Sequence, residues 1–230
     1  RMTTKMQRTS DEYGITIIDL LEHNEISHNE IKDAIISSVV PNVMHSLCSG
    51  MIKYFGIQPM VVEPGVKTGI RITSENPAQI GADRIVDAVG AYELYGGPVV
   101  VIDYGTATTY DFINGNGDFF AGVTSPGIRI SAKALWEDAA KLPEIEIKKP
   151  STILARETIS SMQAGLIFGQ IGQTEYIVKN MIKESGLKDV KVVATGGLGK
   201  IIANETKYIQ YYNPTLTLEG MRLIYAKQKR

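Results

Sequence analysis

Hydrophobic and polar residues alternate most regularly in the second half of the chain, where they predict strands followed by helices. The apolar run 99–103 and the segments 108–113 and 119–123 have the length and composition of strands. Asn-Gly in the segment 114–117 is a strong hairpin signal, because this pair suits a tight turn between alternating segments. We expect three antiparallel strands, followed by helices over 128–141 and 158–184, a buried strand over 190–194, and a last helix from near Pro214.

The first half predicts a similar unit with shorter strands. The segment 9–12, Thr-Ser-Asp-Glu, is typical of a helix N-terminus, and a helix through Leu20 and Leu21 follows. The further pattern predicts a β-rich run over 34–40, a helix over 42–55, short strands at 60–62 and 69–72, and a helix over 82–94. Gly-Gly-Pro at 96–98 breaks the chain. We therefore expect an α/β protein of two related domains with mixed sheets, residues 1–96 and 97–230.

Composition narrows the class of protein. The 230 residues carry 24 basic and 25 acidic side chains, which argues against a nucleic-acid partner because such proteins present a basic face. Cys48 is the single cysteine, so no disulfide forms within the chain and a reducing, cytoplasmic compartment is expected. No apolar run approaches the length of a membrane span, and the three histidines lack zinc-site spacing. We expect no nucleic acid and no membrane among its partners.

The segment 99–111, VVVIDYGTATTYD, carries the first candidate chemistry. Asp103 ends a buried strand, Gly105 permits a tight turn, and Thr106 supplies a hydroxyl and an N–H group there. A carboxylate for a cation beside donors for phosphate is what a nucleotide site needs. The alternative is a core strand that runs into a threonine-rich hairpin, since threonine is also a good strand former. This segment alone does not separate the two interpretations.

A second cluster, Gly81-Ala82-Asp83-Arg84, opens the helix expected over 82–94. One interpretation is a carboxylate general base beside a guanidinium that grips an anionic substrate. The other is an acidic residue placed favourably in the first turn of a helix, with arginine as its exposed partner. Both fit the pattern.

Two further segments are weaker signals. Gly196 and Gly197 follow the strand over 190–194 and would let a ligand approach the backbone, although an ordinary tight turn accounts for such a pair more often. Thr158 begins a helix and is either an N-cap or a substrate contact. Glycines 165, 169 and 172 punctuate that helix, and because glycine costs about 1 kcal/mol relative to alanine, we expect close packing there. No Walker-type loop, G-x-G-x-x-G or serine nucleophile elbow is present.

Taken in order, these motifs resemble the type III pantothenate kinases, which share the superfold of acetate and sugar kinases, Hsp70 and actin. The likeness runs from the segment 9–12 to the tail and is densest at GADRIVDA (81–88), VVVIDYGTATTYD (99–111), SPGIRISAKAL (125–135), TISSMQAG (158–165), ATGGL (194–198) and NPTLTLEGM (213–221). Several motifs in one order are far more specific than any single one. The resemblance implies two ribonuclease H-like domains with mixed sheets.

The resemblance also implies a reaction and roles for individual residues. ATP would phosphorylate the primary hydroxyl of pantothenate, the first step toward coenzyme A, with Mg²⁺ bound to the nucleotide. Asp83 would take the hydroxyl proton, and Gly81, Ala82, Arg84 and Thr158 would contact pantothenate. Asp103 would hold a monovalent cation, K⁺ or NH₄⁺. Thr106 with Gly105 would contact ATP phosphate, Gly196 and Gly197 would lie by the adenosine, and the protein would be a homodimer.

Two departures from the family pattern qualify these expectations. The family opens with a strand that carries D-x-G-N-T, a first phosphate loop, and the sequence has only Asp103-Tyr104-Gly105-Thr106 of this kind. We therefore expect that the first strands of the N-terminal domain are absent and that the chain as given is inactive. Ser74 stands where relatives often have an aromatic residue beside the substrate.

Rival functions remain open from the sequence. One is a non-catalytic regulator similar to the Bvg accessory factor, and the other is a sugar or acetate kinase of the same superfold. The pair Asp83 and Asp103 favours the enzyme, because a binding module needs no general base.

Overall fold

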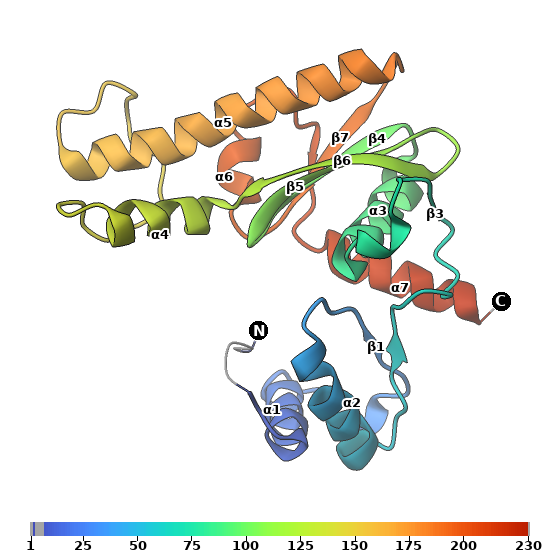
Figure 1. Ribbon diagram of the computed structural model, residues 1–230. Helices are drawn as coiled ribbons and strands as arrows, with labels where there is room; N and C mark the ends of the chain where they lie inside the picture. The colour runs from blue at the N-terminus through green and yellow to red at the C-terminus, as the bar shows by residue number, and fades with distance from the viewer. Residues whose placement is uncertain (1, 3–6, 230) are drawn as a thin grey trace. The chain divides into compact units, whose positions relative to one another are not determined.

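A computed structural model describes residue 2 and residues 7–229, which form two compact units (Figure 1). The first unit takes the chain up to Thr68, then residues 78–86 and the chain from Met221 onward. The second takes Gly69–Pro77 and Asp87–Gly220. The expected boundary between residues 96 and 97 falls inside the second unit. The assignment of 1–96 and 97–230 to two ribonuclease H-like domains stays a prediction.

The first unit is built on two packed helices, α1 (Ser10–His23) and α2 (Pro41–Phe55). As expected, Thr9 caps α1: its hydroxyl accepts the N–H of Glu12, and the Glu12 carboxylate accepts the N–H of Thr9. These reciprocal bonds satisfy two donors that a helix end leaves unpaired. α2 ends at Gly56 with φ +66°, a left-handed conformation that glycine adopts without cost.

The strands of the first unit are shorter than expected. The run 34–40 contributes only β1 (Ile35–Ile36), which pairs in parallel with β2 (Met60–Val61). The ladder stops at two residues, because Val40 already serves as the N-cap of α2 and Pro41 as its first residue. A short 3₁₀ turn, η1 (His28–Glu30), follows α1.

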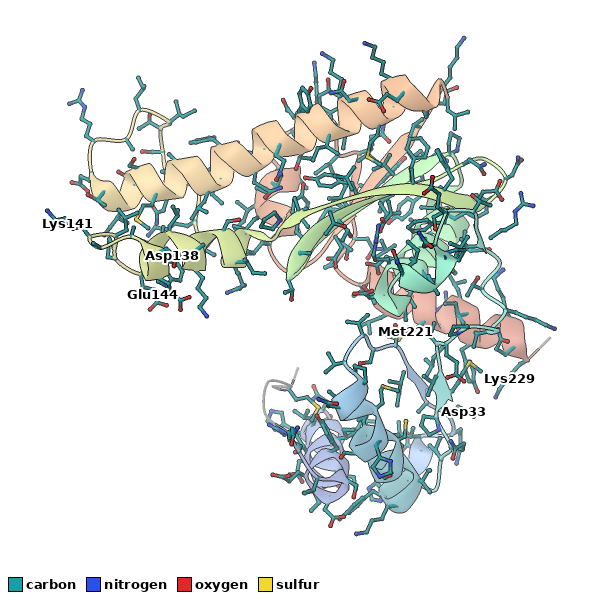
Figure 2. The ribbon with its side chains drawn as sticks, viewed as in Figure 1. Asp33, Asp138, Lys141, Glu144, Met221 and Lys229 are labelled. Atoms are coloured by element: carbon teal, nitrogen blue, oxygen red, sulfur yellow. The ribbon has the colours of Figure 1, made fainter. Side chains whose placement is uncertain are left out.

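The end of α7 (Leu216–Gln228) belongs to this first unit as well. Lys229 Nζ lies 2.8 Å from Asp33 Oδ2 (Figure 2), and the Gln228 amide donates to the Lys67 carbonyl at 2.6 Å. These contacts tie the C-terminal residues to segments 196 and 161 positions earlier in the sequence.

A six-stranded sheet in the order β3-β6-β5-β4-β7-β8 is the centre of the second unit (Figure 1). The expected meander is confirmed, since β4 (Val99–Tyr104), β5 (Ala107–Ile113) and β6 (Asp118–Pro126) pair antiparallel. β7 (Lys191–Thr195) lies parallel to β4, which makes the sheet mixed. The edge strands β3 (Arg71–Ile72) and β8 (Tyr211–Tyr212) have two residues each, and β8 was not expected.

Helices α5 (Thr158–Ser185) and α6 (Gly199–Ala203) cover one face of this sheet. Their buried side chains Ile167, Val178 and Ile202 pack on the even-numbered residues of β4 and β5, such as Ile102 and Phe112. The odd-numbered residues, Asp103 among them, therefore point to the other face. The remaining helices are α3 (Ala82–Tyr95), whose start follows a 3₁₀ turn η2 (Pro77–Gln79), and α4 (Ile128–Asp138), which is three residues shorter than expected.

The glycines of α5 do not pack as expected. A Cβ added at Gly165, Gly169 or Gly172 would meet nothing within 4 Å among the described residues. All three lie on the exposed side of the helix, where Tyr176 is 72% exposed. Close packing within this chain is therefore not the reason for them.

None of the helices in the described part of the chain has both the length and the apolar character to span a membrane.

Candidate active site

Asp103 is the penultimate residue of β4, and a glycine lies beside each of its carboxylate oxygens. A Cβ added at Gly105 would lie 2.9 Å from Oδ2, and one added at Gly196 would lie 2.6 Å from Oδ1. Such distances are shorter than van der Waals contact, so the carboxylate keeps its position only because both neighbours lack a side chain. The structure thus brings Gly196 against Asp103 and Gly105, although Gly196 lies some ninety residues later in the sequence.

Thr106 continues this cluster at the exposed turn between β4 and β5. Its carbonyl accepts the N–H of Gly127 at 3.2 Å, and the Gly105 N–H donates to the Ala107 carbonyl at 3.1 Å. A Cβ at Gly127 would collide with the Thr106 carbonyl. The residue before α4 therefore packs against the backbone of this turn, and the Thr106 side chain is exposed to solvent. Sequence reasoning did not assign this role to Gly127, although it lies in the segment 125–135 that matches the family.

Gly196 and Gly197 form the turn after β7, and they differ in surroundings. Gly196 has φ +92°, and a Cβ there would lie 2.6 Å from the backbone N and C of Tyr104. Gly197 is exposed, and a Cβ there would meet nothing within 4 Å. Gly196 is therefore a packing requirement, whereas Gly197 presents open backbone to solvent.

Thr158 is exposed at the start of α5, where Glu157 is the N-cap. It lines an open pocket of about 540 Å³ together with Leu135, Leu142, Arg156, Ser161 and Met162. Thr106 contacts Gly127 at the start of α4, whereas this pocket is lined by Leu135 near the end of the same helix. At 1.5 Å per residue, the two ends are roughly 10 Å apart along the helix axis. The second unit does not bring Thr158 into the cluster around Asp103.

The first unit holds the remaining candidates, Gly81 to Arg84, at the start of α3. Asp83 Oδ1 accepts the N–H of Arg84 at 2.9 Å, so the helix N-terminus orients the carboxylate. A Cβ at Gly81 would lie 2.5 Å from the same oxygen and 3.2 Å from Val39 Cγ1. Within the described residues no donor contacts Oδ2.

Two side chains behind the Gly196 turn also lie close to the candidate site. The Tyr104 hydroxyl bonds to Thr174 Oγ1 at 2.8 Å, and burial raises the pKa of Tyr104 far above its usual value. The Tyr212 hydroxyl donates to the Gly196 carbonyl at 3.0 Å. Sequence reasoning missed Tyr212, because no motif or periodicity marks a residue of a two-residue edge strand. Ser74, which stands where relatives often have an aromatic residue, is half-buried, and its hydroxyl is not exposed to solvent.

Two solved structures share this fold. A Baf family transcriptional activator from Campylobacter jejuni superimposes with a TM-score of 0.59 at 21% identity, over 93% of this chain and 88% of that one. The ethanolamine utilization protein EutJ from Carboxydothermus hydrogenoformans gives a TM-score of 0.51 at 18% identity, over 94% and 74%. At such identities the likeness concerns the fold alone. The expected fold class is confirmed: the protein has a mixed α/β fold, which it shares with these two proteins.

Sequence comparison resolves the family. The model of the type III pantothenate kinase family matches residues 1–180. A type III pantothenate kinase from Agathobacter rectalis is 67% identical over 230 residues, which are 100% of this chain and 88% of that protein. One from Bacillus cytotoxicus is 51% identical over 227 residues, or 99% and 86%. The chain belongs to the type III pantothenate kinase family, as its motifs predict.

These relatives also bear on the expected alternative of a non-catalytic regulator. The Baf family protein shares the fold at only 21% identity, whereas the relatives at 67% and 51% identity are named as kinases. The regulator is therefore not favoured.

Proposed function

We propose that this chain transfers the γ-phosphoryl group of ATP to the primary hydroxyl of pantothenate, with Asp83 as the general base. Family membership gives the reaction class: the chain is a kinase, and its family phosphorylates pantothenate with ATP on the route to coenzyme A. The observation that supports the role of Asp83 is its fixed carboxylate, with Oδ1 held by the Arg84 N–H and Oδ2 left to the substrate.

The chemistry asked of these residues is modest. Phosphoryl transfer has a loose transition state, so the protein mainly positions the reactants and neutralises charge. Asp83 Oδ2 would accept the proton of the pantothenate hydroxyl as its oxygen bonds to the γ-phosphorus and the bond to the β-phosphate oxygen breaks. Gly81 and Ala82 would frame pantothenate, and Arg84 would face its carboxylate, since a guanidinium suits that group. Thr158 is a further proposed pantothenate contact.

Asp103 is proposed to hold a monovalent cation, K⁺ or NH₄⁺. The carboxylate lies beside Gly105 and Gly196, and neither glycine places a side chain against its oxygens. A hard cation prefers such oxygen ligands, and its charge would partly neutralise a nearby phosphate. The residues present therefore fit the ion.

The nucleotide contacts are proposed for the same unit. Thr106 would donate to ATP phosphate through its exposed hydroxyl, and Gly105 would contact the phosphate because a residue without a side chain lets the ligand approach the turn. Gly196 and Gly197 would lie by the adenosine, where the missing side chains let a ligand approach the backbone. Mg²⁺ would accompany ATP and neutralise its β- and γ-oxygens.

We further propose that the protein is a cytoplasmic homodimer. The exposed side of α5 carries Gly165, Gly169 and Gly172 in line with an exposed Tyr176, and glycines let the backbones of two helices approach closely. The single cysteine is compatible with a reducing compartment.

The test is phosphoryl transfer by the full-length protein, measured as ADP release with pantothenate, acetate or a hexose as acceptor and with K⁺, NH₄⁺ or Na⁺ as the only monovalent cation. We expect turnover with pantothenate alone, in K⁺ or NH₄⁺ and not in Na⁺. Asp103→Asn should raise the K⁺ concentration for half-maximal activity, whereas Asp118→Asn in the same sheet should not. Turnover with acetate or a hexose would refute the acceptor, and equal rates in Na⁺ would refute the cation.

A further inference from the structure

Tyr212 is the side chain that joins the sheet edge to the turn at Gly196. It lies on β8, half-buried, and its hydroxyl donates to the Gly196 carbonyl at 3.0 Å. The same carbonyl accepts the N–H of Gly199 at 3.2 Å. Two donors on one carbonyl fix the orientation of the peptide that links Gly196 to Gly197.

The orientation of this peptide affects both neighbours of the turn. A peptide unit is planar, with its C=O and N–H pointing in opposite directions. When Tyr212 holds the Gly196 carbonyl on the protein side, the Gly197 N–H is therefore directed away from it. That N–H meets no acceptor within the described part of the chain, and Gly197 is exposed.

Gly196 lies directly beside the carboxylate of Asp103. A Cβ at Gly196 would lie 2.6 Å from Asp103 Oδ1 and equally close to the backbone of Tyr104. Any shift of the turn therefore changes the space beside that carboxylate.

The ring of Tyr212 is also wedged in place. A Cβ at Gly199 would lie 2.9 Å from the Tyr212 ring and 3.0 Å from the Tyr104 ring. The Tyr104 hydroxyl is hydrogen-bonded to Thr174 of α5, which fixes the Tyr104 ring. The rings of Tyr104 and Tyr212 therefore both pack against Gly199 at the end of the turn. Loss of the Tyr212 hydroxyl alone would leave this packing in place.

We infer that Tyr212 is a positioning residue that sets the Gly196–Gly197 peptide for nucleotide binding and, through Gly196, the Asp103 carboxylate for its cation. This inference rests on the proposed roles of Gly196, Gly197 and Asp103. Tyr212 itself lies outside the family motifs, and its hydroxyl acts through a backbone carbonyl without touching substrate.

The test is Tyr212→Phe in the full-length protein, with Tyr211→Phe as the matched control. Tyr211 is the adjacent residue on the same strand, and its ring stacks on Tyr95 at 4.7 Å while its hydroxyl has no hydrogen bond among the described residues. Tyr212→Phe should raise the KM for ATP and the half-activating K⁺ concentration about three- to tenfold, the usual effect of one lost hydrogen bond. The KM for pantothenate and the Tm should stay close to those of Tyr211→Phe.

Direct binding of a fluorescent ATP analogue separates this inference from the proposed function. A weaker Kd in Tyr212→Phe, unmatched in Tyr211→Phe, supports the positioning role even if no acceptor is phosphorylated. Unchanged ATP binding and K⁺ activation in Tyr212→Phe would overturn the inference while leaving pantothenate phosphorylation standing. Equal losses for ATP and pantothenate with a lowered Tm would also overturn it, because they would indicate a structural role only.

Discussion

The glycines around Asp103 and the glycines on α5 illustrate opposite uses of the same residue. Gly105 and Gly196 have carboxylate oxygens within 2.9 Å of where a Cβ would lie, whereas Gly165, Gly169 and Gly172 have nothing within 4 Å among the described residues. In the first region the missing side chain makes room for a group of the same chain. In the second region the missing side chains leave exposed helix backbone that contacts no other described residue of this chain. The same substitution, glycine to alanine, should therefore have opposite signs in the two regions.

The largest effect is expected for Gly196→Ala. The new Cβ would meet the Tyr104 backbone at 2.6 Å in a residue with φ +92°, and neither the backbone nor the left-handed conformation yields cheaply. Strain and overpacking together should lower the free energy of unfolding by about 3 kcal/mol or more. Urea unfolding followed by circular dichroism measures this loss. A variant as stable as the wild type would contradict the close packing of the turn.

Gly105→Ala should separate function from stability in the same region. Its Cβ would meet the far end of one flexible side chain, Asp103 Oδ2, and the Ala107 carbonyl only at 3.5 Å. We expect a stability loss of about 1 kcal/mol but a half-activating K⁺ concentration at least roughly tenfold higher, because the carboxylate must rotate away. Cation titration of the ADP-release rate is the measurement. An unchanged cation requirement would contradict the proposed role of Asp103.

Alanine at position 169 should act in the other direction. Within one chain, Gly169→Ala replaces a poor helix former at an open position and should raise the stability of α5 by about 1 kcal/mol. If two copies meet at this face, the added methyl group should also weaken the dimer. Thermal unfolding at low protein concentration and sedimentation equilibrium test the two effects. A lower Tm in the dissociated chain would mean that the face is not open as described.

The smallest effect concerns Asp118, a carboxylate of the same sheet held by donors instead of glycines. Arg71 Nε donates to Oδ1 at 2.7 Å and Asn114 Nδ2 to Oδ2 at 2.9 Å, and the Arg71 bond is the main cause of a pKa below the usual 3.8. A folded-state pKa below the unfolded one gives stability that is present above about pH 4 and disappears as the pH falls further. Asp118→Asn should therefore destabilise slightly at neutral pH and not in acid. A difference in urea midpoint that does not shrink as the pH falls below about 4 would contradict this assignment.

The elements and motif residues could be predicted from the sequence because they depend on local patterns, whereas contacts between distant segments could not. The capping box at Thr9, the antiparallel meander of β4 to β6 and the motif positions around Asp103 are local patterns, and the structure confirms the elements. The role of Gly196 as a close neighbour of Asp103 depends on the pairing of β4 with β7, some ninety residues apart. Glycine itself does not tell which neighbour it meets, and the close packing expected for α5 is not found among the described residues of this chain.

The partition of the chain was equally hard to foresee. Residues from Met221 onward join the first unit through contacts such as Lys229 with Asp33, and no local composition signals such a return. Tyr212 shows the same limit at the scale of one residue, since its partner is a backbone carbonyl sixteen positions away. Sequence patterns predict elements and motif residues, whereas supporting contacts depend on the folded chain.

The central claim, that Asp83 is the general base of a pantothenate kinase, is tested most directly by Asp83→Asn. Asparagine keeps the shape, and its side-chain oxygen accepts the Arg84 N–H as the carboxylate does, but it does not take up a proton. Calorimetry should show pantothenate binding with a Kd within a few-fold of the wild type, while single-turnover phosphoryl transfer from ATP to pantothenate in the full-length protein falls by about 10²–10⁴. Transfer at the wild-type rate with normal binding would contradict the account.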